Sequence, residues 1–232
     1  MPFMRHLDAS FPHVWDRWEA NGTKWTIQDL PPSDEDEALD ILLKHLCPDE
    51  VLCALSDIIN DPVSVQCISK VWRYYFQQRT TLACYAESAG ERKLVALNVC
   101  AVKEKGEELS MEVVGKKWEN VYKVLEYMES KVDCLEYMGL DKALTALGLV
   151  VRKEYRGAKL GARVLAAREP LCQHLGIKGT LTIFTGIASQ KSAVSCGFTS
   201  VLEVSIRELA EIGLDYPKDD NRLIKLMVKK YE

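Results

Sequence analysis

The sequence lacks the features that define several common classes of protein. No apolar run approaches the ~20 residues that a membrane span requires, so we expect no membrane association. It has no long basic run, and its net charge is −4 (30 Lys and Arg against 34 Asp and Glu), which argues against binding nucleic acid through phosphate contacts. Residues 1–6 contain no apolar stretch after Arg5, so no secretory signal is expected and a cytoplasmic location is predicted.

Metal-binding and disulfide patterns are also missing. The eight cysteines form no CxxC pair, and the four histidines are scattered without the spacing of metal ligands. No metal site is therefore predicted. Since most cysteines lie inside apolar segments, we expect buried free thiols in a reducing cytosol.

What the sequence does contain is the composition of a globular protein. Its 232 residues are 47% hydrophobic and 28% charged, which excludes global disorder and suits one domain, or one domain with a small appendage. Residues 1–22 contain Trp15 and Trp18 but no clear period, and we interpret them as a loosely attached N-terminal arm. Residues 23–232 are predicted to form a single domain.

Hydrophobic periodicity predicts a mixed α/β fold for this domain. Seven strands are expected, at residues 24–30, 81–87, 93–102, 144–151, 180–184, 198–206 and 223–229. Helices are expected between the acidic run 34–37 and Pro48, and at residues 49–59, 63–78, 117–138, 157–175 and 188–196. Pro170 should kink or end the fifth of these helices. The continuous apolar run 144–151 is typical of a central strand buried on both faces.

The most informative segment joins this central strand to the helix that follows it. In Arg156-Gly-Ala-Lys-Leu-Gly161, a Gly-containing turn leads into a helix start, where several N–H groups lack partners and the helix dipole is positive. Gly157 and Gly161 allow close approach of a ligand, and Arg156 adds a positive charge, so the segment suits a pyrophosphate. It is neither a P-loop, which needs GxxxxGK[ST], nor a dinucleotide-binding GxGxxG.

This segment resembles the acetyl-CoA pyrophosphate loop of the GNAT superfamily of N-acetyltransferases, whose pattern is [Arg/Gln]-x-x-Gly-x-[Gly/Ala]. Arg156 and Gly161 match, whereas Lys159 stands where the middle Gly is usual. Upstream, Val151 and Tyr155 match the family's lead-in, Val-x-Pro-x-Tyr-Arg-Gly. Lys159 still offers its backbone N–H to a phosphate, at a cost in backbone freedom.

Two further segments are similar to insect arylalkylamine N-acetyltransferases. Ser189 lies eight residues before Gly197, as in the Tyr-Ser…Gly-Phe element of those enzymes, with Ala188 in place of the aromatic residue. The early motif of those enzymes is Phe-Phe-x-Asp-Glu-Pro-Leu, and its Glu is the catalytic base. Here Asp49-Glu50-Val-Leu52 follows Pro48 and keeps the Asp, the Glu and the Leu.

The resemblance implies the GNAT fold, an α/β (α+β) structure with a mixed central sheet of about seven strands and helices on both faces. It also implies that Glu50 is the catalytic base and that Ser189 orients the substrate or donates to the leaving thiolate. The alternatives are structural, a first-turn helix residue for Glu50 and an N-cap for Ser189. Many members have a Tyr that protonates the thiolate, but Ala193 occupies its position, so that role is not carried over.

Acetyl-CoA is the cofactor that the resemblance implies. Strand 144–151 is expected to separate from its neighbour, which leaves backbone groups of Leu149 and Val151 free for the pantetheine arm and for polarising the thioester carbonyl. The segment from Arg156 to Ala162 would hold the pyrophosphate. The predicted cofactor-binding residues are Leu149, Val150, Val151, Arg156, Gly157, Ala158, Lys159, Leu160, Gly161 and Ala162.

The predicted function is transfer of an acetyl group from acetyl-CoA to a small primary amine, by direct attack in a ternary complex and in a monomeric enzyme. The amine stays open between an arylalkylamine, such as dopamine, serotonin or tyramine, and agmatine or a polyamine. Because a carboxylate is a much weaker base than an alkylamine, a water relay to Glu50 is expected. The alternatives are a non-catalytic acyl-CoA-binding protein on the same fold and a protein or peptide N-acetyltransferase.

Five aromatic residues are candidates for lining the amine pocket: Trp72, Tyr74, Tyr75, Trp118 and Tyr122. Aromatic residues at helical spacing commonly belong to a hydrophobic core, so that interpretation is kept beside the first.

Overall fold

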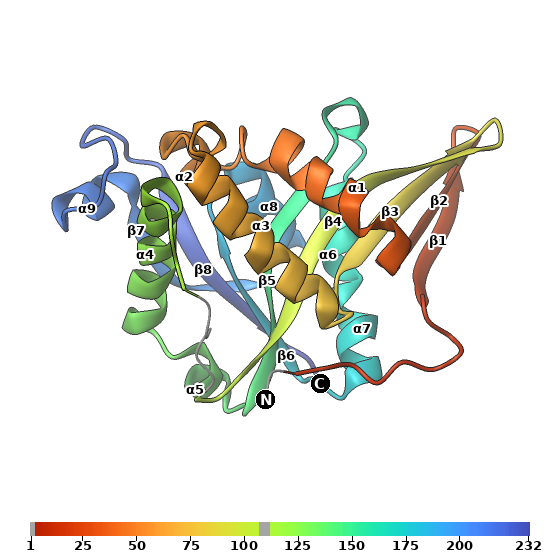
Figure 1. The fold of residues 1–232 in the computed structure, drawn as a ribbon. Helices are drawn as coiled ribbons and strands as arrows, with labels where there is room; N and C mark the ends of the chain where they lie inside the picture. The colour runs from red at the N-terminus through yellow and green to blue at the C-terminus, as the bar shows by residue number, and fades with distance from the viewer. Residues whose placement is uncertain (1–2, 107–111) are drawn as a thin grey trace.

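A computed structural model describes residues 3–106 and 112–232 of the chain. Within them, eight strands form one twisted sheet in the order β1-β2-β3-β4-β5-β6-β8-β7 (Figure 1). The strands are β1 Val14–Ala20, β2 Thr23–Asp29, β3 Leu82–Ser88, β4 Glu91–Glu104, β5 Lys142–Val151, β6 Gly179–Phe184, β7 Thr199–Ser205 and β8 Leu223–Lys230. Neighbouring strands are antiparallel except for the parallel pair β5 and β6. The predicted mixed α/β fold is confirmed, with eight strands instead of seven.

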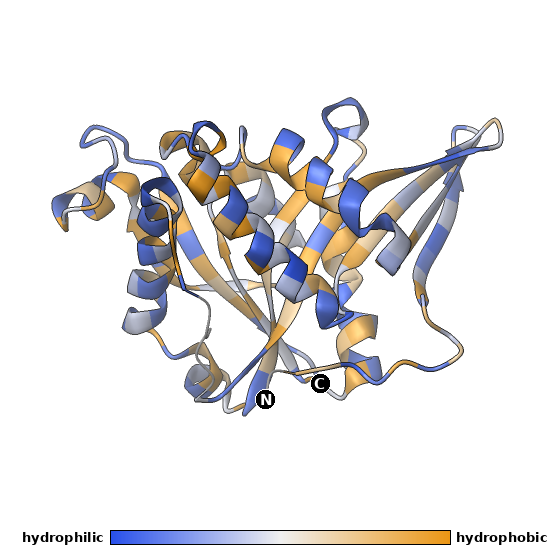
Figure 2. Ribbon diagram, viewed as in Figure 1, coloured by the Kyte–Doolittle hydropathy of each residue, from blue (hydrophilic) through white to orange (hydrophobic). Residues whose placement is uncertain are grey.

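Helices cover both faces of this sheet. The helices are α1 Glu35–Ile41, α2 Val51–Leu55, α3 Pro62–Gln77, α4 Lys116–Lys131, α5 Cys134–Met138, α6 Leu160–Ala166, α7 Arg168–Leu175, α8 Ile187–Ser195 and α9 Ile206–Glu211. Figure 1 shows α1, α3 and α4 in front of the sheet and α6 and α7 behind it. Figure 2 shows hydrophilic residues along the outer sides of α3 and α4 and hydrophobic residues along the central strands. The cores therefore lie between the sheet and its two helical layers.

Each helical layer has its own hydrophobic core. The front core is built around large side chains that are almost fully buried, among them Trp72, Phe76 and Trp118. The rear core packs Leu160, Val164 and Leu171 against the opposite face of the sheet. All eight cysteines are unpaired, and seven of them are buried.

The sequence pattern missed strand β1 and also helix α9, which follows β7 directly. Strand β1 pairs with β2 across a tight turn at Asn21-Gly22, where both residues have positive φ (52° and 72°). Asn-Gly is the pair that favours a two-residue hairpin, and this was the available signal. The rings of Trp18 and Trp25 stack across the two strands at 5.7 Å. Residues 14–20 are therefore part of the sheet.

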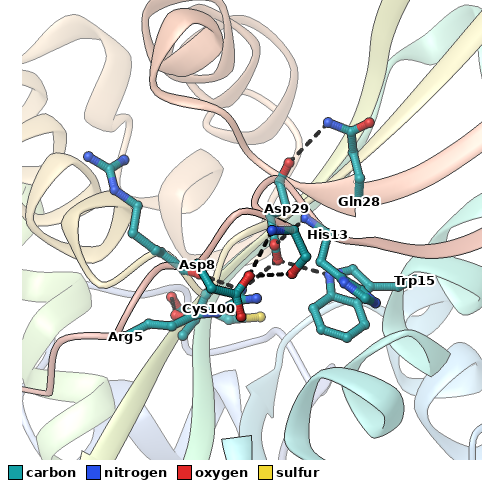
Figure 3. A network of polar contacts seen from close by, with 10 residues as sticks. Arg5, Asp8, His13, Trp15, Gln28, Asp29 and Cys100 are labelled. Carbon is teal, nitrogen blue, oxygen red and sulfur yellow. Dashed lines mark hydrogen bonds and ion pairs between the residues drawn. The ribbon is translucent and has the colours of Figure 1, made fainter. Parts of the chain in front are cut away.

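The segment before β1 is anchored by a buried polar network (Figure 3). Asp29, which is 0% exposed, accepts hydrogen bonds from Arg5 Nη1 (2.8 Å), Trp15 Nε1 (2.9 Å) and His13 N (2.7 Å). Arg5 Nη1 also donates to Arg79 O (3.1 Å). The loose attachment predicted for residues 1–22 is therefore wrong for the part that the structure describes; Met1 and Pro2 lie outside it.

Three of the predicted helices are interrupted in the structure. The helix expected at 49–59 is α-helical only from Val51 to Leu55 and is followed by a 3-10 turn at Ile58–Asn60. The helix expected at 117–138 ends at Lys131, and Asp133 begins the next one because its carboxylate accepts from the N–H groups of Leu135 and Glu136 (3.0 Å each). The helix expected at 157–175 begins only at Leu160 and is interrupted at Ala167, just before Pro170. A proline ring clashes with the carbonyl four residues earlier, which explains an interruption at this point.

Candidate active site

The sheet opens between β5 and β6. These parallel strands pair at one point, where Leu144 stands beside Thr180. The expectation that β5 is buried on both faces is wrong beyond that point, because residues 145–149 are only half-buried. An apolar strand that is half-exposed beside a gap in its own sheet provides a surface for an extended, largely apolar ligand.

The orientation of the β5 backbone follows from its bonding to β4. Arg152 N donates to Val95 O of β4 (2.9 Å). Because successive residues turn their backbone groups to opposite edges of a strand, Val151 and Leu149 turn theirs toward the side of β6. The predicted separation of this strand from its neighbour is confirmed, and these backbone groups face the gap.

A bulge shapes β5 at the gap. The register with β4 shifts after Asn98, where β5 contains one extra residue. Gly148 lies in this bulge with a φ of +118°, and a Cβ there would stand 3.1 Å from Leu46 Cδ2. The carbonyl of Gly148 accepts from Asn98 Nδ2, and that of Leu147 accepts from Trp72 Nε1 (2.9 Å each). Side chains from the sheet and from α3 thus hold the bulge in place.

A cavity of about 150 Å³ occupies the gap, and we call it the catalytic cavity after the role that we propose for it. Its walls come from β5, β6, α2, α3 and α4. Among the residues singled out in the sequence, those that line it are Glu50, Leu149, Ser189, Trp72, Tyr75 and Trp118. The structure therefore brings together three predicted site residues that are separated by up to 139 positions in the chain.

Glu50 caps helix α2 and also lines the catalytic cavity. It is the N-cap of α2, and its carboxylate accepts from the N–H groups of Leu52 (3.2 Å) and Cys53 (2.8 Å). Thr185 Oγ1 also donates to Glu50 Oε1. These donors fix the carboxylate at the cavity wall. Glu50 is thus the N-cap of the helix and not the first-turn residue considered as the alternative, and this role does not remove the carboxylate from the cavity.

Thr185 is the site residue that the sequence did not reveal. It follows β6 directly, precedes the Gly186 N-cap of α8, and lines the catalytic cavity. Its contact with Glu50 joins residues 135 positions apart. The only local signal was a hydroxyl residue at the end of a predicted strand, which is too common to identify a site.

Ser189 lies in the first turn of α8 and faces the same cavity. Its hydroxyl donates to Gly186 O (2.8 Å). The N-cap of the helix is Gly186, so the alternative interpretation of Ser189 as the N-cap is wrong.

The loop predicted to hold pyrophosphate lies at the end of β5 and is exposed. Gly157 and Lys159 both have positive φ (90° and 56°). The position where the GNAT pattern usually has Gly is therefore left-handed, and a non-Gly residue there costs about 1–2 kcal/mol. The first hydrogen bond of α6 runs from Arg163 N to Lys159 O (3.1 Å), so the N–H groups of Leu160, Gly161 and Ala162 have no partner within the helix. These free donors fit a pyrophosphate.

Arg156 links this loop to the segment that carries Glu50. Its guanidinium donates to Asp49 Oδ2 (2.7 Å) and to Val151 O (3.1 Å). Two of the three motifs from which the resemblance was drawn are thus in direct contact. Of the other predicted cofactor residues, Ala158 lies in the exposed loop, whereas the side chains of Val150 and Leu160 are buried, in the front core and the rear core respectively.

A second cavity adjoins the first between α3 and α4. It has a volume of about 630 Å³ and shares Tyr75, Leu125, Glu129, Thr145 and Leu181 with the catalytic cavity. Of the aromatic candidates, Tyr74, Tyr75 and Tyr122 line this second cavity. We call it the entry cavity.

Cys53 lies beside Glu50 in the catalytic cavity. A hydrogen bond with Cys47, burial, and the negative charge of Glu50 raise the pKa of Cys53 well above its ordinary value. Cys53 is therefore a neutral thiol at neutral pH and a poor nucleophile, which argues against an acetyl-cysteine intermediate. In residues 3–106 and 112–232, no group of three or more His, Cys, Asp or Glu side chains could hold a metal ion.

Comparisons with known proteins place this fold. No family model and no curated protein sequence matches the chain. It is similar to a structure provisionally named arylalkylamine N-acetyltransferase 7 of the yellow fever mosquito Aedes aegypti, at 25% identity and a TM-score of 0.92, over 99% of this chain and 100% of that one. Arylalkylamine N-acetyltransferase 2 of Aedes aegypti is 16% identical with a TM-score of 0.78, over 90% and 99% of the two chains. A Drosophila melanogaster polyamine N-acetyltransferase is 18% identical with a TM-score of 0.75, over 89% and 99%.

These similarities confirm the GNAT fold and the resemblance to insect arylalkylamine N-acetyltransferases. The predicted acyltransferase class and the use of acetyl-CoA are supported by the first of these neighbours, which is 25% identical. In the part of the chain that the structure describes, no helix has the length and apolar character needed to cross a membrane.

Proposed function

We propose that this protein transfers the acetyl group of acetyl-CoA to a small primary amine, with Glu50 as the base. The observation that carries the proposal is the catalytic cavity. One small space is bordered by the carboxylate of Glu50, the hydroxyl groups of Thr185 and Ser189, and the unpaired edge of β5. Deprotonation of an amine and polarisation of a thioester carbonyl need these groups.

The acetyl donor would lie along β5. The free N–H groups of Leu160, Gly161 and Ala162, together with Arg156, would bind its pyrophosphate. The backbone groups of Leu149 and Val151 would bind the pantetheine arm, which brings the thioester to the Gly148 bulge. This arrangement rests on the separation of β5 from β6 at Leu144.

Glu50 would receive the proton that the amine loses as its nitrogen attacks the thioester carbonyl. The carboxylate is held for this by Thr185 and by the N–H groups of Leu52 and Cys53. Oriented in this way, it also attracts a cationic amine into the cavity. Ser189 is placed at the same wall, where its hydroxyl would orient the reacting groups.

The entry cavity would admit the amine. Its lining combines tyrosine rings with four carboxylates and two lysines, so carboxylates are in excess. The charged residues are Glu104, Glu126, Glu129, Asp133, Lys103 and Lys105, and Lys103 pairs with Glu129 at 2.6 Å. Aromatic faces and carboxylates both attract organic cations. The lining therefore suits a small cationic amine, whether an arylalkylamine or an agmatine-like or polyamine substrate.

Thiol release from acetyl-CoA, measured with tyramine, dopamine, serotonin, agmatine, spermidine and a set of N-terminal peptides, tests this function. We expect turnover of at least one small amine and none of the peptides. Turnover of peptides alone would identify a protein N-acetyltransferase. Acetyl-CoA binding without turnover of any amine or peptide would identify a non-catalytic binding protein.

Glu50→Gln tests the role of the carboxylate within this assay. The amide oxygen keeps one of the two hydrogen bonds from the α2 backbone, so the loss of stability should be smaller than when the whole cap is removed, while loss of a general base lowers kcat/KM by about 10²-fold or more. Glu50→Ala should show the same loss together with about 1 kcal/mol of instability, because the cap is removed. A Glu50→Gln enzyme with wild-type kinetics would remove Glu50 from the mechanism.

A further inference from the structure

Arg168 is a buried cation that has no counter-ion among the described residues. It is the first residue of α7 and is 0% exposed. Its Nε donates to Asn98 Oδ1 (2.7 Å), and its Nη1 donates to the hydroxyl oxygens of Thr180 (3.0 Å) and Thr182 (2.8 Å). Within residues 3–106 and 112–232, Arg168 Nη2 is buried and has no hydrogen-bond partner. Among the described residues its hydrogen-bond acceptors are neutral oxygens, and the neutral Cys100 thiol interacts with it as well.

The surroundings of Arg168 supply no compensating negative charge. The adjacent Glu169 accepts from Lys229 Nζ instead (2.8 Å). Burial raises the pKa of the Cys100 thiol to about 11 and that of the Cys172 thiol to about 12, so both are neutral at neutral pH. Burial also raises the pKa of the nearby Tyr231 phenol. Burying a charge in this way is costly unless a partner appears.

Arg168 donates hydrogen bonds to side chains that line the catalytic cavity. Thr180 stands at the last paired position of β5 and β6, and Thr182 and Asn98 both line the cavity. Asn98 is held at both ends, since its Oδ1 accepts from Arg168 and its Nδ2 donates to Gly148 O (2.9 Å). Arg168 thus lies behind the gap in the sheet and orients the side chain that fixes the β5 bulge.

We propose that Arg168 is a positioning residue whose charge favours the negative charge that develops on the acetyl donor during transfer. This inference rests on the proposed acetyl transfer. In that step a C–N bond forms, the C–S bond breaks with its electron pair going to sulfur, and the amine proton goes to Glu50. The sulfur therefore becomes a thiolate in a region of low dielectric constant, where a fixed cation stabilises an anion more than it does in water.

A buried cation behind the gap also fits the presence of Ala193 where many GNAT members have the Tyr that protonates the thiolate. Ala193 is 0% exposed and packs with Leu165, Phe184 and Phe198 in a small hydrophobic cluster. It can give no proton to the thiolate. A buried cation behind the gap allows the thiolate to leave as an anion, without a side-chain acid.

Binding of CoA and of desulfo-CoA, which lacks the thiol, separates this role from a structural one. A nearby cation lowers the pKa of a thiol by about one unit or more. For a shift of about one unit, the affinity for CoA relative to desulfo-CoA should rise by up to about 10-fold as the pH is raised from well below to above the pKa values of the free and the bound thiol. Titration calorimetry of the wild-type protein measures this ratio without any turnover.

Arg168 variants should remove that pH dependence. In Arg168→Gln we expect a flat ratio and a kcat lowered about 10-fold or more, with the KM for the amine nearly unchanged. Arg168→Lys keeps the charge and should recover part of the rise. Arg17→Gln, which removes an exposed cation from β1, serves as the matched control and should behave as wild type.

A second pair of variants covers the case in which Arg168→Gln does not fold. Cys100 is fully buried against Arg168, and it is not among the described residues that line the catalytic cavity. Cys100→Asp places a carboxylate beside Arg168, and Cys100→Asn is the neutral control of nearly the same size. The rise in the CoA ratio should be lost in Cys100→Asp and kept in Cys100→Asn.

Two outcomes overturn the inference. One is a wild-type ratio that does not change with pH. The other is an equal loss of affinity for CoA and desulfo-CoA in Arg168→Gln, with the pH dependence retained, which would make Arg168 purely structural. These binding measurements need no amine, so they are independent of the turnover assay. If the protein binds CoA but acetylates nothing, the turnover assay refutes the proposed function, and the pH dependence of CoA binding still tests the role of Arg168.

Discussion

Replacing Asp29 with asparagine measures how firmly the N-terminal segment is joined to the sheet. The carboxylate is 0% exposed and accepts from Arg5 Nη1, Trp15 Nε1 and His13 N at 2.7–2.9 Å. Asparagine keeps one acceptor oxygen and turns an NH₂ group toward the remaining donors. Arg5, which is 7% exposed, would keep its bond to a neutral carbonyl and lose its counter-ion.

The expected cost follows from this arrangement. Breaking a buried ion pair by removing one partner costs about 3–5 kcal/mol, because a buried charge is left uncompensated. For a chain of this size, each kcal/mol lowers the melting temperature by about 2–4 °C, so Asp29→Asn should melt about 10 °C lower than the wild type. Urea unfolding followed by circular dichroism, with thermal melts, measures both quantities.

Two control variants separate the buried ion pair from a general effect of mutation. Arg5→Met combined with Asp29→Asn removes both charges, so the double variant should be more stable than the sum of the single changes predicts. Asp36→Asn removes a carboxylate that pairs with Arg73 at the surface (2.8 Å), and it should melt almost as the wild type does. A loss below about 1 kcal/mol in Asp29→Asn would refute the anchoring that we infer from the network.

Three further predictions concern the site and the thiols. Arg156→Ala should raise the KM for acetyl-CoA more than the KM for the amine in steady-state assays, and equal effects would mean that the loop is misassigned. Gly148→Ala should lower the unfolding free energy by about 1–3 kcal/mol and weaken acetyl-CoA binding, measured by calorimetry. The reason is that φ is positive at this position and the new Cβ would stand 3.1 Å from Leu46 Cδ2. An unchanged affinity for acetyl-CoA would contradict this prediction. Burial raises the pKa of Cys100 from 9.0 to about 11, so its contribution to stability is complete below about pH 9 and is lost as the pH rises toward 11, by about 3 kcal/mol. Urea unfolding at about pH 8 and about pH 10.5 should show this fall, and Cys100→Ala should show less of it; an equal fall would assign the effect to other groups.

Strong local patterns were sufficient for most of the fold. The apolar runs around Leu144 and Leu181 predicted β5 and β6 within about two residues, and the helix that ends at Gly197 was placed in the same way. Strand β1 was missed because it is only partly buried and its pairing with β2 is irregular between Val14 and Asp16, which breaks the alternation. Such a strand is stabilised by its partner more than by its own composition.

Only the site residues that belong to recognisable sequence motifs could be predicted. Glu50, Ser189 and Arg156 were identified from spacing and resemblance, and the structure places the first two in one cavity and joins the third to Asp49. Thr185 was not predicted, because its role depends on a hydrogen bond to Glu50, which is far away in the sequence.

The sequence by itself determined the strands and helices with strong periodicity, the likeness to the GNAT pattern and the residues of its motifs, because these depend on neighbours along the chain. The tertiary structure alone decided the eighth strand, the opening of the sheet beyond Leu144, and the burial of Arg168 behind it. These features arise where distant segments meet. The strength of the electrostatic interactions of a buried guanidinium depends on the local dielectric constant and on the hydrogen-bond acceptors around it. Both are set by residues that are distant in the sequence.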